Sequence, residues 1–156
     1  ISCSGICLTV VDIDDKMFKV QLVEETLSRT TASSWEKETN INLERALLPT
    51  SRMGGHFVQG HVDGIVKIIN IESLKDSAVW HFSLTGEHKM YIVEKGSICL
   101  DGISLTVAQK SSEYFSVALI PHTLNVTTWG QKEIGDLVNI EVDIMAKYIR
   151  NLMEKE

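Results

Sequence analysis

Apolar and polar residues alternate along much of the chain, which is the pattern of half-buried β-strands. Ile6, Leu8 and Val10 share one face of the first such stretch, and Cys7 and Thr9 share the other. Further short stretches rich in branched and aromatic residues predict strands at residues 18–22, 66–71, 79–82 and 115–120.

Two segments have a helical pattern instead. Residues 144–156 place an apolar stripe on one helix face, made of Ile144, Tyr148, Ile149, Leu152 and Met153. Residues 87–94 predict a short helix. Turn residues such as Gly135-Asp136 separate the predicted strands.

The chain contains an internal repeat with an offset of 97 positions. The shift lays ISCSGICLTV (1–10) over ICLDGISLTV (98–107), and the register then holds without a gap. Across residues 1–44 it gives 16 identical pairs, far more than unrelated sequences would share. We therefore interpret the chain as two homologous units.

Many short antiparallel strands in two copies predict a mainly β protein of two six-stranded Greek-key barrels, because barrel closure removes exposed sheet edges. We place the first barrel at residues 1–49, the second at 50–143, and a C-terminal helix at 144–156. The first unit lacks the opening segment of the second, about 40 residues or a third of a typical domain. We expect the sequence, rather than the native protein, to be the incomplete one.

Composition and charge restrict the classes of function that the protein could have. With 21 acidic and 15 basic side chains the net charge is −6, and the chain has no basic cluster of the kind that binds nucleic acid. Its apolar runs are strand-sized and too short to span a membrane. The three cysteines, Cys3, Cys7 and Cys99, have no metal-ligand spacing and indicate free thiols in a reducing compartment.

The two copies differ at a few positions that could carry chemistry. Cys7 aligns with Ser104 between identical neighbours, and Ala46 aligns with Asp143. Glu24-Glu25 aligns with Pro121-His122 in the segment before a shared Thr-Leu pair. The differences gather on one polar strand face and one loop, which suits two related pockets with different roles.

The sequence resembles the riboflavin synthase family over essentially its whole length. The blocks that match are Ser4–Val10, Glu25–Leu27, Ile41–Ala46, Gly54–Gly64, Tyr91–Ser97, Asp101–Val107, Leu119–Thr123 and Val138–Asp143. The family's opening segment with its Phe-Thr-Gly motif is absent, as is a serine just before the Cys7 strand. Ser4 stands where the family usually has asparagine.

The resemblance implies a reaction between two molecules of 6,7-dimethyl-8-ribityllumazine. One passes a four-carbon unit to the other, giving riboflavin and a ribitylamino-pyrimidinedione, with no metal or organic cofactor. It also implies a homotrimer in which the first barrel of one subunit faces the second barrel of its neighbour. A cytoplasmic enzyme is expected, or a plastid one if a transit peptide precedes it, with possible association with lumazine synthase.

The resemblance also assigns site residues. Cys7, His61, Ser104 and Asp143 would transfer protons and form the adduct. The first pocket would add Leu8, Thr9, Gln21, Leu22, Val23, Glu24, Glu25, Thr26, Gly60 and Val62. The second would add Lys95, Leu105, Thr106, Ile120, Pro121, His122, Thr123, Leu124 and Asn125.

Several of these residues also have ordinary structural interpretations. Cys7 could be a small buried residue, and Lys95 a solvated turn lysine. Cys3 and Cys99 are interpreted as structural. His56 and His61 would point to opposite faces of a strand, so we do not predict a zinc site; His56 would cap the Gly54-Gly55 turn.

Residues outside the predicted pockets have structural interpretations as well. Asn42 and Glu44 recur as Asn139 and Glu141, which predicts a structural task common to both barrels. The C-terminal stripe is more often packed on its own domain than used for assembly, although the family uses this helix in its trimer.

Two other functions compete with the enzyme. A lumazine- or flavin-binding antenna protein would use the same two barrels without turnover, but such proteins keep one pocket and lose the other. A flavin reductase barrel would need an Arg-x-Tyr-Ser/Thr motif for the flavin phosphate, which this chain lacks.

Overall fold

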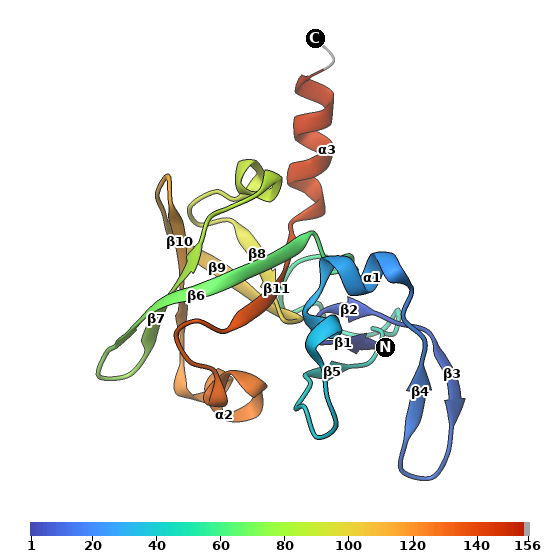
Figure 1. Ribbon diagram of the computed structural model, residues 1–156. Coiled ribbons are helices and arrows are strands. Elements are labelled where there is room, and N and C mark those ends of the chain that lie inside the picture. The colour runs from blue at the N-terminus through green and yellow to red at the C-terminus, as the bar shows by residue number, and fades with distance from the viewer. Residues whose placement is uncertain (155–156) are drawn as a thin grey trace.

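The second unit forms a closed six-stranded barrel in the computed structural model, which describes residues 1–154. Around the barrel the strands follow the order β10-β7-β6-β11-β8-β9, and every pair is antiparallel (Figure 1). Their bounds are β6 Gly64–Ser73, β7 Ala78–Ser83, β8 Ser97–Leu100, β9 Ile103–Lys110, β10 Tyr114–Leu119 and β11 Leu137–Val142. The predicted mainly β barrel architecture is confirmed for this unit.

Alternating side chains explain why these strands close on one core. In β7, Ala78, Trp80 and Phe82 are buried, whereas the residues between them are half-exposed. Trp80 stacks on Trp129 and Phe82 on Phe115, each pair with ring centroids 5.3 Å apart. The barrel interior is therefore filled by side chains.

The first unit is an open version of the same structure. Strands β2 (Ile6–Cys7), β1 (Ser2–Cys3) and β5 (Leu43–Glu44) form one sheet, while β3 (Val10–Ile13) and β4 (Phe18–Val20) form a hairpin. The strand predicted across residues 5–10 is thus two short strands. Within residues 1–154 this unit has no counterparts of β6 and β7.

Helices recur at the offset of the repeat. Helix α1 (Glu24–Arg29) and the 3₁₀ helix η1 (Thr31–Ser34) match α2 (Pro121–Val126) and η3 (Thr128–Gln131). Each offset is again 97 positions, so the structure confirms the repeat. The helix predicted at residues 87–94 is a 3₁₀ helix, η2, at Glu87–Tyr91.

Two asparagines join the units reciprocally. The Thr31 N–H donates to Asn139 Oδ1 at 2.8 Å, and the Thr128 N–H donates to Asn42 Oδ1 at 2.8 Å. Both asparagines and both threonines are repeat counterparts, so the contact has twofold pseudosymmetry. This confirms the structural task predicted for Asn42 and Asn139.

The pseudo-twofold axis that relates the two units passes between two tight turns. Ser4-Gly5 and Asp101-Gly102 each have two residues at positive φ, and the turns lie back to back. A Cβ on Gly5 would lie 2.7 Å from the backbone nitrogen of Gly102. The side-chain amides of Asn42 and Asn139 donate to the carbonyls of Asp101 and Ser4.

Helix α3 (Ile144–Met153) projects away from both units (Figure 1). The Asp143 side chain caps its N-terminus, and Lys147 forms an ion pair with Asp63 at 2.5 Å. Residues 155–156 of the predicted helix lie outside the described residues. No helix within residues 1–154 is long and apolar enough to cross a membrane.

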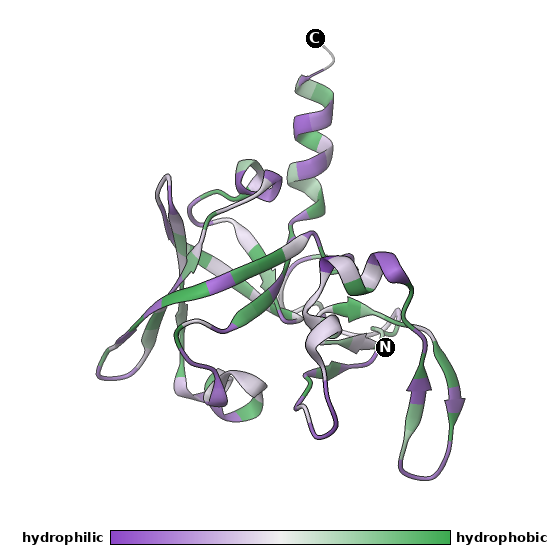
Figure 2. Ribbon diagram, in the orientation of Figure 1, coloured by the Kyte–Doolittle hydropathy of each residue, from purple (hydrophilic) through white to green (hydrophobic). Residues whose placement is uncertain are grey.

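The predicted apolar stripe does not pack on its own chain. Four of its five predicted members are between 54% and 71% accessible, namely Tyr148, Ile149, Leu152 and Met153, whereas Ile144 is half-buried. Met145, at 55%, extends the exposed surface. Figure 2 shows hydrophobic and hydrophilic residues alternating along this helix. The interpretation of the stripe as intramolecular packing is therefore wrong for Tyr148, Ile149, Leu152 and Met153.

Candidate functional site

A linker without regular structure, residues 50–63, crosses from the first unit to the second. The N–H groups of Gln59 and Gly60 donate to the two carboxylate oxygens of Glu141 at 2.7 and 2.8 Å. The Gly60 carbonyl accepts the Cys7 N–H at 2.9 Å. His56 and His61 therefore lie on a loop. The strand on which we expected them to point to opposite faces does not form.

A groove of about 1020 Å³ lies between the two units, under this linker. Four of the predicted site residues line it: Cys7, Gly60, Ser104 and Asn125. The rest of its wall is formed by residues 1–2, 40–47, 52–59, 101–103 and 126–128 and by Gln131. Its size is at the upper limit of small-molecule pockets in proteins.

Cys7 and Ser104 face the groove from equivalent strands. Both side chains are exposed, on the polar faces predicted for β2 and β9. Gly60 covers Cys7 closely enough that a Cβ there would lie 2.6 Å from the Cys7 nitrogen, and Gly55 packs against the Ser104 side chain in the same manner. Neither residue is sealed in the hydrophobic interior, as a purely structural role would require.

His56 is the functional candidate that sequence reasoning missed. Its Nδ1 lies 2.7 Å from Ser104 Oγ, so it binds the serine rather than capping the Gly54-Gly55 turn. Burial lowers the pKa of His56 below its usual range, partly offset by the nearby carboxylates of Asp143 and Glu141. A neutral histidine can accept a proton from the serine. The only available signal was the glycine pair that lets the backbone pass over Ser104.

Asp143 and His61 flank the groove without lining it. Asp143 is half-buried at the end of β11, where one carboxylate oxygen accepts the Met145 N–H at 3.0 Å. Its other oxygen accepts no hydrogen bond within residues 1–154. His61 is exposed one residue after Gly60.

The remaining predicted residues lie outside the groove. In the first unit Leu8 is part of the core, Leu22 and Val62 pack against that core, and Thr9 is exposed. Helix α1 carries Glu24, Glu25 and Thr26, with Gln21 and Val23 exposed just before it.

The second unit repeats this arrangement. Lys95 is exposed at positive φ, and its N–H donates to the Val107 carbonyl at 2.9 Å. Thr106 is exposed and Leu105 packs against the barrel core. Helix α2 and the residue before it carry Ile120, Pro121, His122, Thr123 and Leu124.

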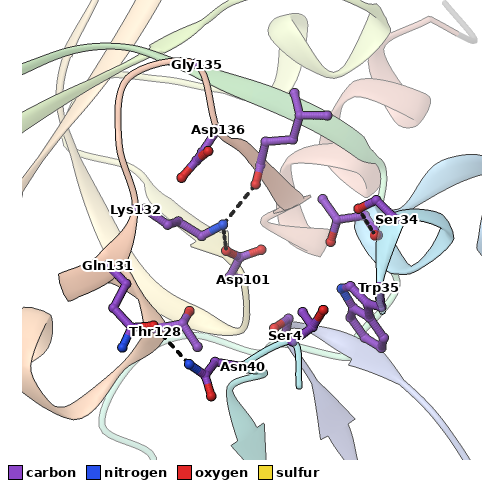
Figure 3. Close-up of a pocket in the computed structure, with 13 residues that line it drawn as sticks. Ser4, Ser34, Trp35, Asn40, Asp101, Thr128, Gln131, Lys132, Gly135 and Asp136 are labelled. Carbon is purple, nitrogen blue, oxygen red and sulfur yellow. Dashed lines mark hydrogen bonds and ion pairs between the residues drawn. The ribbon is translucent and has the colours of Figure 1, made fainter. Parts of the chain in front are cut away.

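A second pocket of about 400 Å³ lies on the pseudosymmetry axis (Figure 3). At its floor the buried Asp101 carboxylate accepts the Trp129 Nε1–H at 3.1 Å and lies 3.4 Å from Lys132 Nζ. Burial raises the pKa of Asp101, and Lys132 and the hydrogen bonds oppose that shift. These contacts all stay within the second unit, which indicates a structural role. Among residues 1–154 no cluster of three His, Cys, Asp or Glu side chains could hold a metal ion.

Comparison with known proteins identifies the two units. The family model of the lumazine binding domain matches residues 1–46 and 59–143. Riboflavin synthase of Brucella abortus is 45% identical over 99% of this chain and 79% of its own length. Riboflavin synthase of Bacillus subtilis is 39% identical over 99% of this chain and 72% of its own length.

Solved structures share the fold. LumP in complex with 6,7-dimethyl-8-(1′-D-ribityl)lumazine superposes with a TM-score of 0.80 at 21% identity, covering 90% of this chain and 75% of LumP. LumP in complex with riboflavin gives 0.78 at 23% identity, covering 90% and 76%. The two matched segments are the two units of the repeat, and the sequence relatives extend over both units. The chain therefore belongs to the lumazine-binding domain family, together with the riboflavin synthases.

Proposed function

We propose that this protein catalyses the riboflavin synthase reaction. Two molecules of 6,7-dimethyl-8-ribityllumazine exchange a four-carbon unit, and the products are riboflavin and 5-amino-6-ribitylamino-pyrimidinedione. The two products together contain the atoms of the two substrates, so the exchange needs no external oxidant or cofactor. The protein is then a transferase that binds two flat heterocycles in opposition and moves protons between them.

The observation that carries this proposal is the pair of diverged polar strand faces. Cys7 and Ser104 occupy the same repeat position and both are exposed, so each unit presents a polar strand face that a substrate can reach. Two units of common origin can bind two identical molecules, and the difference between thiol and hydroxyl allows a donor role and an acceptor role. Fixing the two reactants in place can remove roughly 7–11 kcal/mol of the barrier.

Proton transfer would be carried by groups that the structure places beside Ser104. His56 Nδ1 lies 2.7 Å from Ser104 Oγ, and its lowered pKa keeps the ring neutral and able to accept a proton. Ser104 would give its hydroxyl proton to His56 as its oxygen takes a proton from the acidic ring methyl of one lumazine. We assign adduct formation and the remaining proton steps to Cys7, His61 and Asp143.

The other family-derived residues would bind substrate. Thr9 and Thr106 occupy the same repeat position, Thr9 between β2 and β3 and Thr106 on β9, and Ile120 and Thr123 lie at the start of α2. We propose that backbone groups of these residues bind the pyrimidinedione edge. Lys95 and helices α1 and α2 would contact the ribityl chains.

Assembly into a homotrimer is supported by the uncovered stripe of α3. Residues at i, i+3, i+4 and i+7 from Met145 are all exposed on a helix that has no intramolecular partner for that face. Three such helices would bury the stripe and bring the first unit of one subunit to the second unit of the next. The three free cysteines are consistent with a cytoplasmic location. Association with lumazine synthase remains part of the proposal, because that enzyme would supply the substrate.

The reaction is tested by incubating the protein with 6,7-dimethyl-8-ribityllumazine and following riboflavin absorbance and fluorescence. We expect riboflavin and pyrimidinedione in equal amounts, and Cys7→Ala or Ser104→Ala should lower the rate more than the substrate affinity. Tight binding of the lumazine without product would instead indicate an antenna protein. In that case the enzyme proposal is wrong.

Shared sites are tested by mixing two inactive variants. In a mixed trimer, some interfaces join the intact first unit of a Ser104→Ala subunit to the intact second unit of a Cys7→Ala subunit. Mixing and reassembly should therefore restore part of the activity. If activity does not return although mixed trimers form, the site lies within one chain.

A further inference from the structure

Glu141 is a buried carboxylate whose two oxygens are both occupied by the linker. It is only 4% exposed, although it lies on β11 at the edge of the groove. The Gln59 N–H donates to Oε1 at 2.7 Å, and the Gly60 N–H donates to Oε2 at 2.8 Å. Hydrogen bonds to a charged acceptor are among the stronger ones in proteins. The second unit therefore grips the linker backbone at one defined point.

Gly60, one of the two residues that Glu141 holds, is in direct contact with Cys7. The Gly60 carbonyl accepts the Cys7 N–H at 2.9 Å, and Gly60 has a φ of +78°. A side chain at residue 60 would collide with the backbone of Cys7, so only glycine permits this approach. A continuous path thus runs from the Glu141 carboxylate through the Gly60 peptide to the backbone of Cys7.

The contact joins the second unit to the linker. Glu141 lies on β11, and the linker residue that it holds, Gly60, is the one that accepts the Cys7 N–H of the first unit. Its repeat counterpart Glu44 is exposed, and its side chain makes no hydrogen bond within residues 1–154.

We propose that Glu141 is a positioning residue that acts through Gly60 to fix Cys7 at the groove. This inference rests on the proposed function, because Cys7 must take part in the reaction for its position to matter. The linker is held again at Asp63, which accepts the Val142 N–H at 2.9 Å. Loss of the Glu141 contact would therefore free residues 53–60, including His56, without detaching the linker.

The test compares Glu141→Gln with Glu113→Gln, a glutamate exposed in the β9–β10 turn. Glutamine keeps the shape of the side chain, but its NH₂ group would face one of the two backbone N–H groups and cannot accept a hydrogen bond from it. We expect amide hydrogen exchange at Cys7 and Gly60 to accelerate about ten- to a hundred-fold. We expect kcat for riboflavin formation to fall about ten-fold with little change in KM. Glu113→Gln should change neither quantity.

A second pair of variants covers the case in which Glu141→Gln does not fold. Gln59→Pro removes the N–H that donates to Glu141, whereas Gln59→Ala keeps it. We expect faster exchange of the Cys7 amide only in the proline variant. Unchanged exchange in Glu141→Gln and Gln59→Pro would overturn the proposal, as would faster exchange with an unchanged kcat. If the wild-type protein forms no riboflavin, the proposed function fails, whereas the exchange data still report on the contact itself.

Discussion

Gly5 and Gly102 are two of the residues at which the fold tolerates no side chain. A Cβ on Gly5 would lie 2.7 Å from the Gly102 nitrogen, and the φ of Gly5 is +83°. We expect Gly5→Ala to lower the free energy of unfolding by about 2–4 kcal/mol, since it combines backbone strain with overpacking. Gly54→Ala is the control, because nothing lies within 4 Å of its Cβ position. Urea unfolding of both variants measures the difference, and equal stabilities would contradict the back-to-back contact.

His56 determines how the proposed reaction should depend on pH. Burial lowers its pKa below the usual 6.5, so the ring stays neutral, and able to accept a proton, at pH values somewhat below 6.5. Protonation below that pKa removes the base, so kcat/KM should fall on the acid side. His56→Gln should lower kcat/KM at neutral pH and lose this acid limb. A His56→Gln profile parallel to that of the wild type would exclude His56 as the base.

At the scale of elements, several strands could be predicted from sequence, whereas helices α1 and α2 could not. Alternation placed β6, β7 and β10 within one or two residues of their bounds, because each strand has one face in the barrel core. Helices α1 and α2 are six residues long and have no buried residue, so they leave no periodic apolar pattern. Because α1 and α2 occupy equivalent positions in the repeat, the chain should contain either both helices or neither.

Helix α3 gives a prediction about assembly. Tyr148 and Leu152 are 66% and 67% exposed and have no packing role within their own chain. If α3 forms the proposed trimer, the double substitution Tyr148→Glu and Leu152→Glu should give a folded monomer, because each apolar side chain buried there contributes about 1.5–3 kcal/mol. Asn151→Glu adds a charge beside the stripe and should leave the trimer intact. Analytical ultracentrifugation distinguishes these outcomes, and a double variant that remains trimeric would contradict the proposed interface.

For the whole molecule, the sequence could predict two units and several of their polar faces but not the contacts between them. Cys7 and Ser104 were found because the repeat compares equivalent positions. His56 was missed because its partner lies 48 residues away and is brought near by an irregular linker. The reciprocal asparagines were recognised as structural, yet only the coordinates show that each bonds to the opposite unit.

Those asparagines should control whether the two units unfold together. Each binds a backbone N–H and a carbonyl of the other unit, and replacing it with alanine leaves both groups unpaired. We expect Asn42→Ala and Asn139→Ala to cost about 1–3 kcal/mol each. In the double variant the first unit, whose core cluster within residues 1–154 is the smaller one, should unfold at a lower urea concentration than the barrel.

Tryptophan fluorescence can follow the units separately, since Trp35 lies in the first unit and Trp80 and Trp129 lie in the barrel. Comparing each protein with its Trp35→Phe version isolates the signal of the first unit. In the parent protein both signals should change at the same urea concentration, because the asparagine pair couples the units. In the double variant they should separate, whereas Asn70→Ala, an exposed change on β6, should leave them together. If the two signals still coincide in the double variant, contacts other than the asparagine pair suffice to couple the units.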